Sequence, residues 1–481
     1  MSGDLSIQGS GPSRDPVDAP SGPVKVDLYE KWRRIYPLWV SGGFQTWRRI
    51  VLVILLLIYY VGPWLSWNGN PGVRFDLENR RFTVFFTTFV PEEFIFLAWL
   101  LLIAALTLFT VTIAAGRIFC GWACPQTIWS LVYFSIERFI EGDRAERMRR
   151  DRGRWSIEYV TRKAIKFSLW AAVALSISIT FVGYFQPIRE LLPRVLTFDL
   201  SKWEMVFVAL PAMGSFFFSA ILREQVCFHM CPYARFQSVM LDRDSLIISY
   251  DEDRGEPRGK RRRDADPEKV GLGHCIDCKK CVNVCPTGID IRDGLQYQCI
   301  GCAACIDACA EVMETMGYGD TLVRYSSENR DQGKTVHWLR PRLVGYSTLI
   351  VVLLVLVGFT MANRIPLDVD VIRDRNRLYR EDWDGSIENV YSLRITNRES
   401  VDRTYEIAFS SEAPLELRGD QRVHIRGGEL RIVPISLLLP GDVELDSRRP
   451  EVQFEVRSTA DEAVVVRATS PFHRPPPRGD R

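Results

Sequence analysis

Residues 94–115, FIFLAWLLLIAALTLFTVTIAA, form an apolar run without one charged side chain. A helix of about 20 apolar residues is long enough to cross a bilayer, and five such runs in one chain argue against buried helices of a soluble core. The sequence therefore predicts a multi-span α-helical membrane protein. The other four predicted spans cover residues 50–67, 167–185, 206–222 and 343–362.

Basic residues are concentrated in alternate segments between these runs. They occur before the first run, at 144–166 between the second and third, and as RGKRRR at 258–263 after the fourth. Because Lys and Arg are retained on the cytoplasmic side, this pattern places the N-terminus inside and the C-terminus outside. Residues 118–136 are also apolar; we read them as a short interfacial or re-entrant helix, since a sixth span would move RGKRRR outside.

Two cysteine runs carry the strongest chemical signal. Residues 275–286 read CIDCKKCVNVCP, and residues 299–310 read CIGCAACIDACA, with Ala310 in the place of the second proline. This doubled spacing is typical of bacterial two-cluster ferredoxins, in which the fourth cysteine of each run ligates the other [4Fe–4S] cluster. A pair of zinc sites does not require three cysteines at this spacing. Free thiolates are typical of a reducing compartment such as the cytoplasm. The resemblance assigns one cluster to Cys275, Cys278, Cys281 and Cys309, and the other to Cys299, Cys302, Cys305 and Cys285.

A second cysteine pattern follows the second and fourth predicted spans. RIFCGWACPQT contains Cys120 and Cys124, and CFHMCPYARFQ contains Cys227 and Cys231; each follows a span and an arginine, so the two form an internal repeat. On one continuous helix, cysteines four apart share a face at about 6 Å, which strains a disulfide but suits one soft ion such as Cu(I).

Three interpretations of these pairs stay open. They are metal ligands, a redox dithiol or buried structural cysteines. Met230 would share the face of Cys227, whereas we expect His229 to be structural. Arg117 and Arg223 are typical of basic residues that anchor span ends at the membrane surface.

The C-terminal segment changes to short alternating strands separated by turn residues, which predicts an all-β sandwich. It contains no cysteine, and its lone histidines, His424 and His473, have no partner at ligand spacing. A binding or scaffolding role is therefore expected there. The chain also lacks a Walker loop, an H-E-x-x-H motif and a C-x-x-C-H motif, and its basic clusters read as inside-positive loops and not as nucleic-acid sites. The expected strands are NVYSLRITN, TYEIAFSS, RVHIRGG, LRIVPISLLL, EVQFEVRS and AVVVRATS.

These features predict five regions, which follow in chain order. They are a disordered cytoplasmic tail at 1–45, a membrane domain with four spans and both Cys-x3-Cys-Pro sites at 46–240, a two-cluster ferredoxin domain at 241–340, a fifth span at 341–363 and a periplasmic immunoglobulin-like sandwich at 364–481.

Over nearly its whole length the chain resembles the cytochrome c oxidase accessory protein family CcoG, also called FixG or RdxA. The motifs CGWACP and CFHMCPYARFQSVM, the doubled ferredoxin run and the terminal sandwich carry the resemblance. It implies a bacterial inner-membrane protein that assembles cbb-type cytochrome c oxidase, and a cupric reductase that passes electrons through two [4Fe–4S] clusters to copper. It further implies oxidase assembly factors or a copper transporter as partners, and a cytoplasmic electron donor that the sequence does not name. Joined to the cysteine spacing, this leads to the hypothesis that copper is held by Cys120, Cys124, Cys227 and Cys231, with Met230 as a further ligand.

Two other functions stay open. Membrane ferredoxins of nitrate and nitrous-oxide respiration share the Cys-x3-Cys-Pro repeat, although they lack the terminal sandwich; this resemblance implies a quinol-linked electron carrier. The third possibility is an assembly scaffold that acts through its outer domain.

Overall fold

The computed structural model describes residues 35–475, except for 68–69, 78–80, 86, 90–92, 264, 338, 374–376, 384, 400, 442, 444–448 and 462–463. From Tyr36 onward, the described residues form one compact unit. The predicted disordered tail falls mostly on residues 1–34, outside the described part of the chain. Its last residues are ordered against the ferredoxin segment, where the amide of Leu38 donates to the carbonyl of Asn283 at 2.7 Å.

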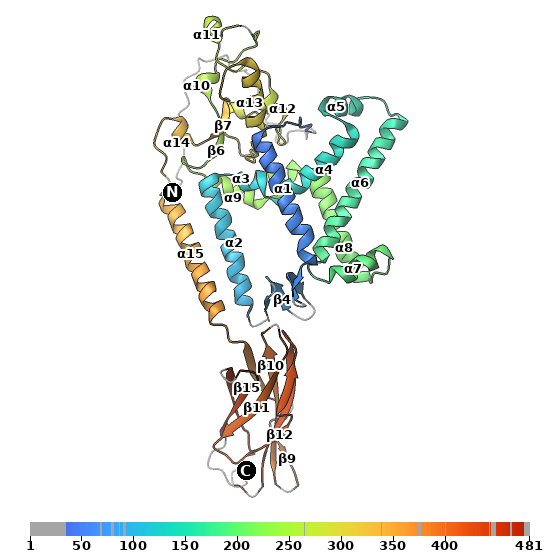
Figure 1. Cartoon of the computed structure of the whole chain (residues 1–481), viewed down its shortest axis with the longest axis vertical. Helices are drawn as coiled ribbons and strands as arrows, with labels where there is room; N and C mark the ends of the chain where they lie inside the picture. The colour runs from blue at the N-terminus through green and yellow to red at the C-terminus, as the bar shows by residue number, and fades with distance from the viewer. Residues whose placement is uncertain are drawn as a thin grey trace, which may run out of the picture. The chain divides into compact units, whose positions relative to one another are not determined.

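Five of the described helices are long and apolar enough to cross a membrane (Figure 1). Each coincides with a predicted span, but two begin clearly earlier, because the helix continues through polar residues before its apolar run. At the start of α6, for example, the Ser156 hydroxyl accepts from the Tyr159 amide at 3.1 Å and caps the helix. The five are α1 (Gly43–Val61, extended by η1, Gly62–Trp64), α2 (Phe94–Ala115), α6 (Ile157–Val182), α8 (Lys202–Ser215, extended by the π-helix η3, Phe216–Leu222) and α15 (Pro341–Ala362).

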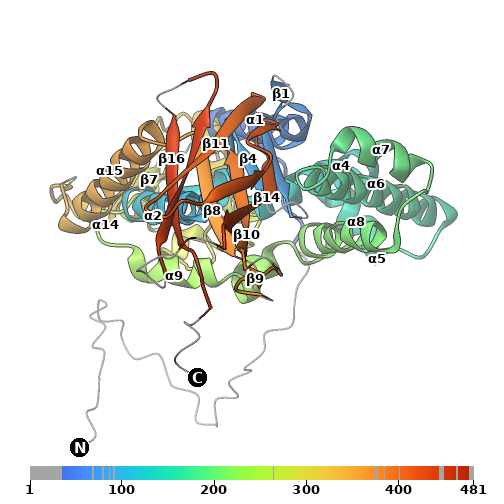
Figure 2. The same ribbon diagram turned by 90° about the horizontal axis from the view of Figure 1, so that it is seen from below.

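The prediction of one short helix over 118–136 is wrong. The segment forms two helices, α3 (Ile118–Trp122) and α4 (Pro125–Glu141), and α4 packs against α6 and η3 (Figures 1 and 2). On its buried face, Glu141 Oε1 lies 2.7 Å from Lys166 Nζ, and Glu137 Oε1 lies 3.5 Å from the same nitrogen. These ion pairs fix α4 to α6. The shorter helices nearby are α5 (Arg144–Arg152), α7 (Ile188–Leu196), η4 (Val226–Met230) and α9 (Pro232–Met240).

The ferredoxin segment is built around a two-stranded antiparallel sheet and two helices that each follow a cysteine loop. Strand β6 (Ile247–Tyr250) pairs with β7 (Val323–Ser326), and Ile247 lies opposite Ser326. Its helical elements are α10 (Glu252–Gly255), α11 (Pro267–Val270), α12 (Lys280–Asn283), η5 (Ile291–Asp293), α13 (Ala304–Met316) and α14 (Glu328–Asp331).

The C-terminal segment is a sandwich of two antiparallel sheets around one apolar core, as predicted. Strands β8, β9 and β12 are additional to the six that the sequence pattern predicts. The sheets contain β8 (Leu367–Arg373), β9 (Arg380–Glu381), β10 (Ile387–Asn397), β12 (Glu416–Gly419) and β14 (Leu430–Leu439) on one side, and β11 (Arg403–Ser411), β13 (Arg422–Ile425), β15 (Glu451–Ser458) and β16 (Val465–Pro471) on the other.

Short strands also occupy the connection between α1 and α2, where the sequence gives no strand signal strong enough to predict them. They are β1 (Ser66–Trp67), β2 (Asn70–Pro71), β3 (Val73–Asp76), β4 (Arg81–Val84) and β5 (Thr87–Phe89).

Candidate metal centres

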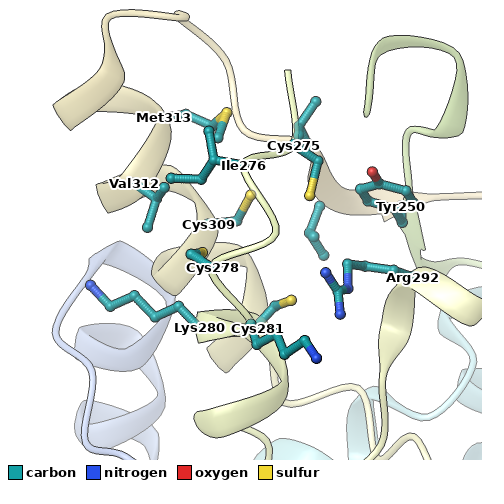
Figure 3. A pocket seen from close by; sticks show the side chains of 13 residues that line it. Tyr250, Cys275, Ile276, Cys278, Lys280, Cys281, Arg292, Cys309, Val312 and Met313 are labelled. Atoms are coloured by element: carbon teal, nitrogen blue, oxygen red, sulfur yellow. The ribbon is translucent and has the colours of Figure 1, made fainter. Parts of the chain in front are cut away.

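The eight ferredoxin cysteines gather in two groups, each with members from both runs. One cavity, site 1, is lined by Cys275, Cys278, Cys281 and Cys309 (Figure 3). A second cavity, site 2, is lined by Cys285, Cys299, Cys302 and Cys305, together with Cys281. This is the crossed grouping that the ferredoxin resemblance implies.

The donor chemistry of both cavities fits a [4Fe–4S] cluster. All twelve cysteines are free thiols, and each cavity offers the four sulfurs that a cubane needs. Burial raises the pKa of the Cys281 thiol to about 12 and that of the Cys299 thiol to about 12. Thiols in this state ionise when a metal ion takes the place of the proton.

Each Cys-x3-Cys-Pro pair spans a break between two helices. Cys124 is the N-cap of α4 and Cys231 is the N-cap of α9, and the proline after each is the first helical residue. The expectation that each pair lies on one continuous helix is therefore wrong. In both repeats the amide of the second cysteine donates five residues back, from Cys124 to the Phe119 carbonyl at 2.9 Å and from Cys231 to the Val226 carbonyl at 2.8 Å.

The same backbone conformation precedes both pairs. Gly116 ends α2 with φ 59° and ψ −125°, and Arg223 ends η3 with φ 47° and ψ −113°. At position 116 an added Cβ would lie 2.3 Å from the carbonyl oxygen of Leu246. This close approach explains why the position is occupied by glycine. Arg223 adopts a region that side chains rarely occupy. The internal repeat inferred from the sequence thus extends to the backbone.

The two repeats exchange contacts with each other. The Arg117 guanidinium, from the first repeat, donates to the Ala234 carbonyl in α9 at 2.6 Å. Arg223, from the second, donates to Glu137 in α4 at 2.7 Å. Both arginines thus fix the helix that follows the other pair, and this is more than an anchoring role at the membrane surface.

Gln126 provides a further link between the two repeats, and it was not predicted from the sequence. Its Nε2 donates to the Phe218 carbonyl at 2.8 Å and to the Arg223 carbonyl at 3.1 Å, while its Oε1 accepts from the Ser219 hydroxyl at 3.1 Å. Because Gln126 lies two residues after Cys124, it joins the first pair to the π-helix before the second.

These contacts bring Cys120, Cys124, Cys227 and Cys231 together; we call them the four-thiol set. Burial raises the pKa of Cys227 to about 12, and the thiols of Cys124, Cys120 and Cys231 add to the increase. Burial likewise raises the pKa of Cys120 to about 11. Among the residues that the structure describes, however, no three Cys, His, Asp or Glu side chains converge closely enough to hold a single ion.

Met230 is exposed, and the two lone histidines of the sandwich make only local contacts. The side chain of Met230 is 54% exposed, so it does not share a buried face with Cys227. In the sandwich, His424 contacts Thr404 and Asp402, and His473 contacts Arg373. These are local surface contacts.

The first Cys-x3-Cys-Pro pair lies directly against site 2. A Cβ on Gly121, between Cys120 and Cys124, would be 2.7 Å from the Ile300 carbonyl oxygen and 2.8 Å from the backbone nitrogen of Cys302. Cys120 packs in the same apolar cluster as Cys302. A glycine here therefore lets α3 touch the backbone of the second cysteine loop.

Two buried side chains of α1 fasten this junction. The Gln45 amide nitrogen donates to the Cys302 carbonyl at 2.9 Å, and Arg48 Nε donates to the Gly121 carbonyl at 2.8 Å. Trp122 Nε1 adds a bond to the Gly301 carbonyl at 3.3 Å. The sequence offered only a weak signal for these residues, namely two polar side chains at the start of an apolar helix.

Fold and sites together define a membrane iron–sulfur electron-transfer protein. Three family models match the chain: a 4Fe-4S binding domain at residues 97–138, a 4Fe-4S dicluster domain at 222–328, and the IG-like fold at the C-terminal of FixG at 357–475. The first of these matches includes Cys120 and Cys124.

Three curated relatives match over most of their length. The nitrogen fixation protein FixG of Rhizobium meliloti is 34% identical over 432 residues, covering 82% of each chain. From Cereibacter sphaeroides, RdxB is 39% identical over 81% of this chain and 84% of its own, and RdxA is 37% identical over 88% of this chain and 91% of its own. The chain belongs to the FixG/RdxA family.

Proposed function

We propose that this protein reduces Cu(II) to Cu(I) at the four-thiol set, with electrons supplied from sites 1 and 2, for the assembly of a cbb-type cytochrome c oxidase. The observation that carries the proposal is the contact of Gly121 with the backbone of Cys302, since it puts the first thiol pair against site 2. Oxidase assembly factors or a copper transporter would receive the product.

In this proposal Cys275, Cys278, Cys281 and Cys309 hold one [4Fe–4S] cluster, and Cys285, Cys299, Cys302 and Cys305 hold the other. When bound, such clusters supply one-electron carriers whose potential depends on their surroundings. Cys302 is buried beneath α3, so the protein itself excludes water between site 2 and the first thiol pair.

Copper is the substrate in this scheme. Cu(II) takes up one electron and becomes Cu(I), the ion for which thiolates are the preferred ligands. Because no three donors converge on one ion in the described residues, we propose a transient association with cysteines of the set, without Met230. Cys124 and Cys231 are the N-cap residues of α4 and α9, and burial raises the pKa of the Cys124 thiol. Copper binding would therefore displace the thiol proton.

We further propose that the N-terminus and the ferredoxin segment face the cytoplasm of a bacterial inner membrane, and that the sandwich faces the periplasm. The support is the concentration of basic residues before α1 and between α2 and α6.

A second candidate function is the oxidation of a membrane quinol. A cavity of about 150 Å³ lies beside Cys299 and is lined by apolar side chains that include Ala115 and Leu246, together with Arg117 and Tyr297. An apolar cavity with a few polar groups is typical of a small-molecule site, and this one adjoins site 2 at the end of α2.

An anaerobic copper titration tests the proposal. Dithionite-reduced protein receives Cu(II), while absorbance reports the clusters and EPR reports the copper. We expect cluster oxidation to match the loss of the Cu(II) signal, and serine at Cys120, Cys124, Cys227 and Cys231 to abolish both. If the clusters stay reduced while Cu(II) persists, copper is not the acceptor; reduction of oxidised clusters by decylubiquinol would then favour the second candidate.

A further inference from the structure

The two cluster sites differ in their access to solvent. Cys278 of site 1 is exposed, whereas Cys302 of site 2 is buried under α3. A macromolecular electron donor therefore approaches site 1 at Cys278 more closely than it approaches site 2 at Cys302.

The basic segment RGKRRR, residues 258–263, is fixed beside site 1. The amide of Gly259 donates to the carbonyl of Cys275 at 3.1 Å. The Arg261 guanidinium donates to the Gly273 carbonyl at 2.6 Å and to the Tyr318 hydroxyl at 2.9 Å. This segment is thus a structured part of the site 1 surface.

Three acidic side chains near site 1 are bound by basic ones. Arg292 pairs with Asp277 at 2.7 Å, Lys280 with Glu311 at 2.6 Å, and Arg258 with Asp293 at 3.5 Å. Lys260, Arg263 and Lys279 present exposed side chains. These three side chains offer positive charge to a partner near Cys278.

The interpretation of RGKRRR as an inside-positive loop does not account for this charge, and the proposed orientation rests on the basic residues before α1 and between α2 and α6. The basic residues that set orientation lie within roughly 15–20 residues of a span end and in connecting loops shorter than about 60 residues. Arg258 lies about 36 residues beyond Leu222, in a connection of well over 100 residues that ends at Pro341. The cluster of charge at site 1 needs another explanation.

We propose that Lys260, Arg263 and Lys279 form the docking surface of an acidic one-electron carrier protein, which delivers electrons to site 1 beside Cys278. In the transfer the carrier loses one electron and the site 1 cluster gains it, with no bond made and no proton moved. Opposite charges steer such partners together and raise the association rate. The inference rests on the electron-transfer part of the proposed function and is independent of copper.

Stopped-flow reduction of the detergent-solubilised, cluster-loaded protein tests this surface. The probe is a reduced plant-type [2Fe–2S] ferredoxin, a small and strongly acidic protein, and absorbance follows the clusters. We compare wild type with K260E/R263E and with K260E/R263E/K279E. The control R243E/R330E/K334E carries the same charge change as the triple variant, on and around α14.

We expect the second-order rate at low salt to fall at least ~10-fold in both test variants and to change little in the control. Salt should slow the wild type strongly and the test variants weakly. Iron content and the rate of reduction by dithionite should be equal in all four proteins, which separates docking from cluster loss.

Equal rates and equal salt dependence in wild type and K260E/R263E would overturn the proposal. So would a variant that loses binding to phosphatidylglycerol vesicles but keeps the wild-type rate with the ferredoxin, because the surface would then serve the membrane. A failed copper titration with an intact ferredoxin rate would refute the copper proposal and leave this one standing.

Discussion

Site 1 and site 2 have the same cysteine spacing and nearly the same local chain path, yet their surroundings are opposite. Site 1 has an exposed cysteine, Cys278, and a basic segment hydrogen-bonded at Cys275. Site 2 is covered by α3, and Gln45 donates to the carbonyl of Cys302. Cys120 of the first Cys-x3-Cys-Pro pair packs in the same apolar cluster as Cys302.

In the proposed function, this difference sets the direction of electron transfer between the two sites. A donor in solution has access to site 1, and the four-thiol set has access to site 2, so electrons would enter at one and leave at the other. The fold of a ferredoxin is nearly symmetric; the asymmetry here comes from what is packed on it.

Loss of the cluster at site 2 should show the largest difference between the roles of the two sites. We expect Cys302→Ser to remove about half of the cluster iron and to abolish Cu(II)-dependent oxidation of the remaining cluster. Cys278→Ser should also remove about half of the iron, but chemically reduced site 2 should still react with Cu(II). Iron analysis and anaerobic copper titration measure both. Equal copper reactivity of the two variants would contradict the proposed direction of electron transfer, from site 1 to site 2.

Gly121→Val should break the junction and leave both clusters in place. The added side chain meets backbone atoms of Ile300 and Cys302, which cannot move aside as a flexible side chain does. We expect copper-driven reoxidation to slow by ~10-fold or more and stability to fall by about 1–3 kcal/mol. Gly43→Val is the matched control, because no atom lies within 4 Å of its added Cβ. A normal copper reaction in Gly121→Val would show that the contact carries no electrons.

Gln126→Leu should loosen the link between the two repeats. The change leaves the carbonyls of Phe218 and Arg223 without this donor, at a cost of about 1–3 kcal/mol. We expect a several-fold slower copper reaction with unchanged iron content and an unchanged rate of cluster reduction by dithionite. Gln332→Leu, on the ferredoxin surface, should behave as wild type. A slower dithionite reaction in Gln126→Leu would place the defect in the clusters and contradict the assignment.

The smallest effect is expected for Trp122→Phe. It removes the two hydrogen bonds that Nε1 donates at 3.3 Å, to the Gly301 carbonyl and to the Tyr325 hydroxyl; the carbonyl still accepts from the Tyr325 hydroxyl at 2.7 Å. Stability should fall by about 1 kcal/mol, and an EPR redox titration should show a shift confined to the site 2 cluster. A shift of the site 1 cluster alone would mean that Trp122 acts through the fold as a whole.

Much of the architecture follows from local patterns. The uncharged run 94–115 predicted α2 to the residue, and the alternating strands predicted both faces of the sandwich. The two cysteine runs predicted the grouping that the cavities display. Each of these signals is repetitive or chemically specific, so neighbouring residues suffice to read it.

The break between helices within each Cys-x3-Cys-Pro pair could have been predicted from the sequence, because the proline after Cys124 and after Cys231 favours the start of a helix. The assumption of one continuous helix obscured it. The exposure of Met230 was not predictable, since a helical face says nothing about which face is covered.

The spans, the sandwich, the cysteine groups and the internal repeat follow from local sequence patterns. That α3 covers site 2, that Gly121 makes the contact, and that RGKRRR lies beside Cys275 became evident only from the three-dimensional packing. The spacing of cysteines indicates what they can ligate, whereas their neighbours in the fold depend on packing between separate segments. Gly121 and Cys302 are more than 100 residues apart, and the hydrogen bond from Gly259 to Cys275 likewise joins residues that are not neighbours in the sequence, so no local pattern encodes these contacts.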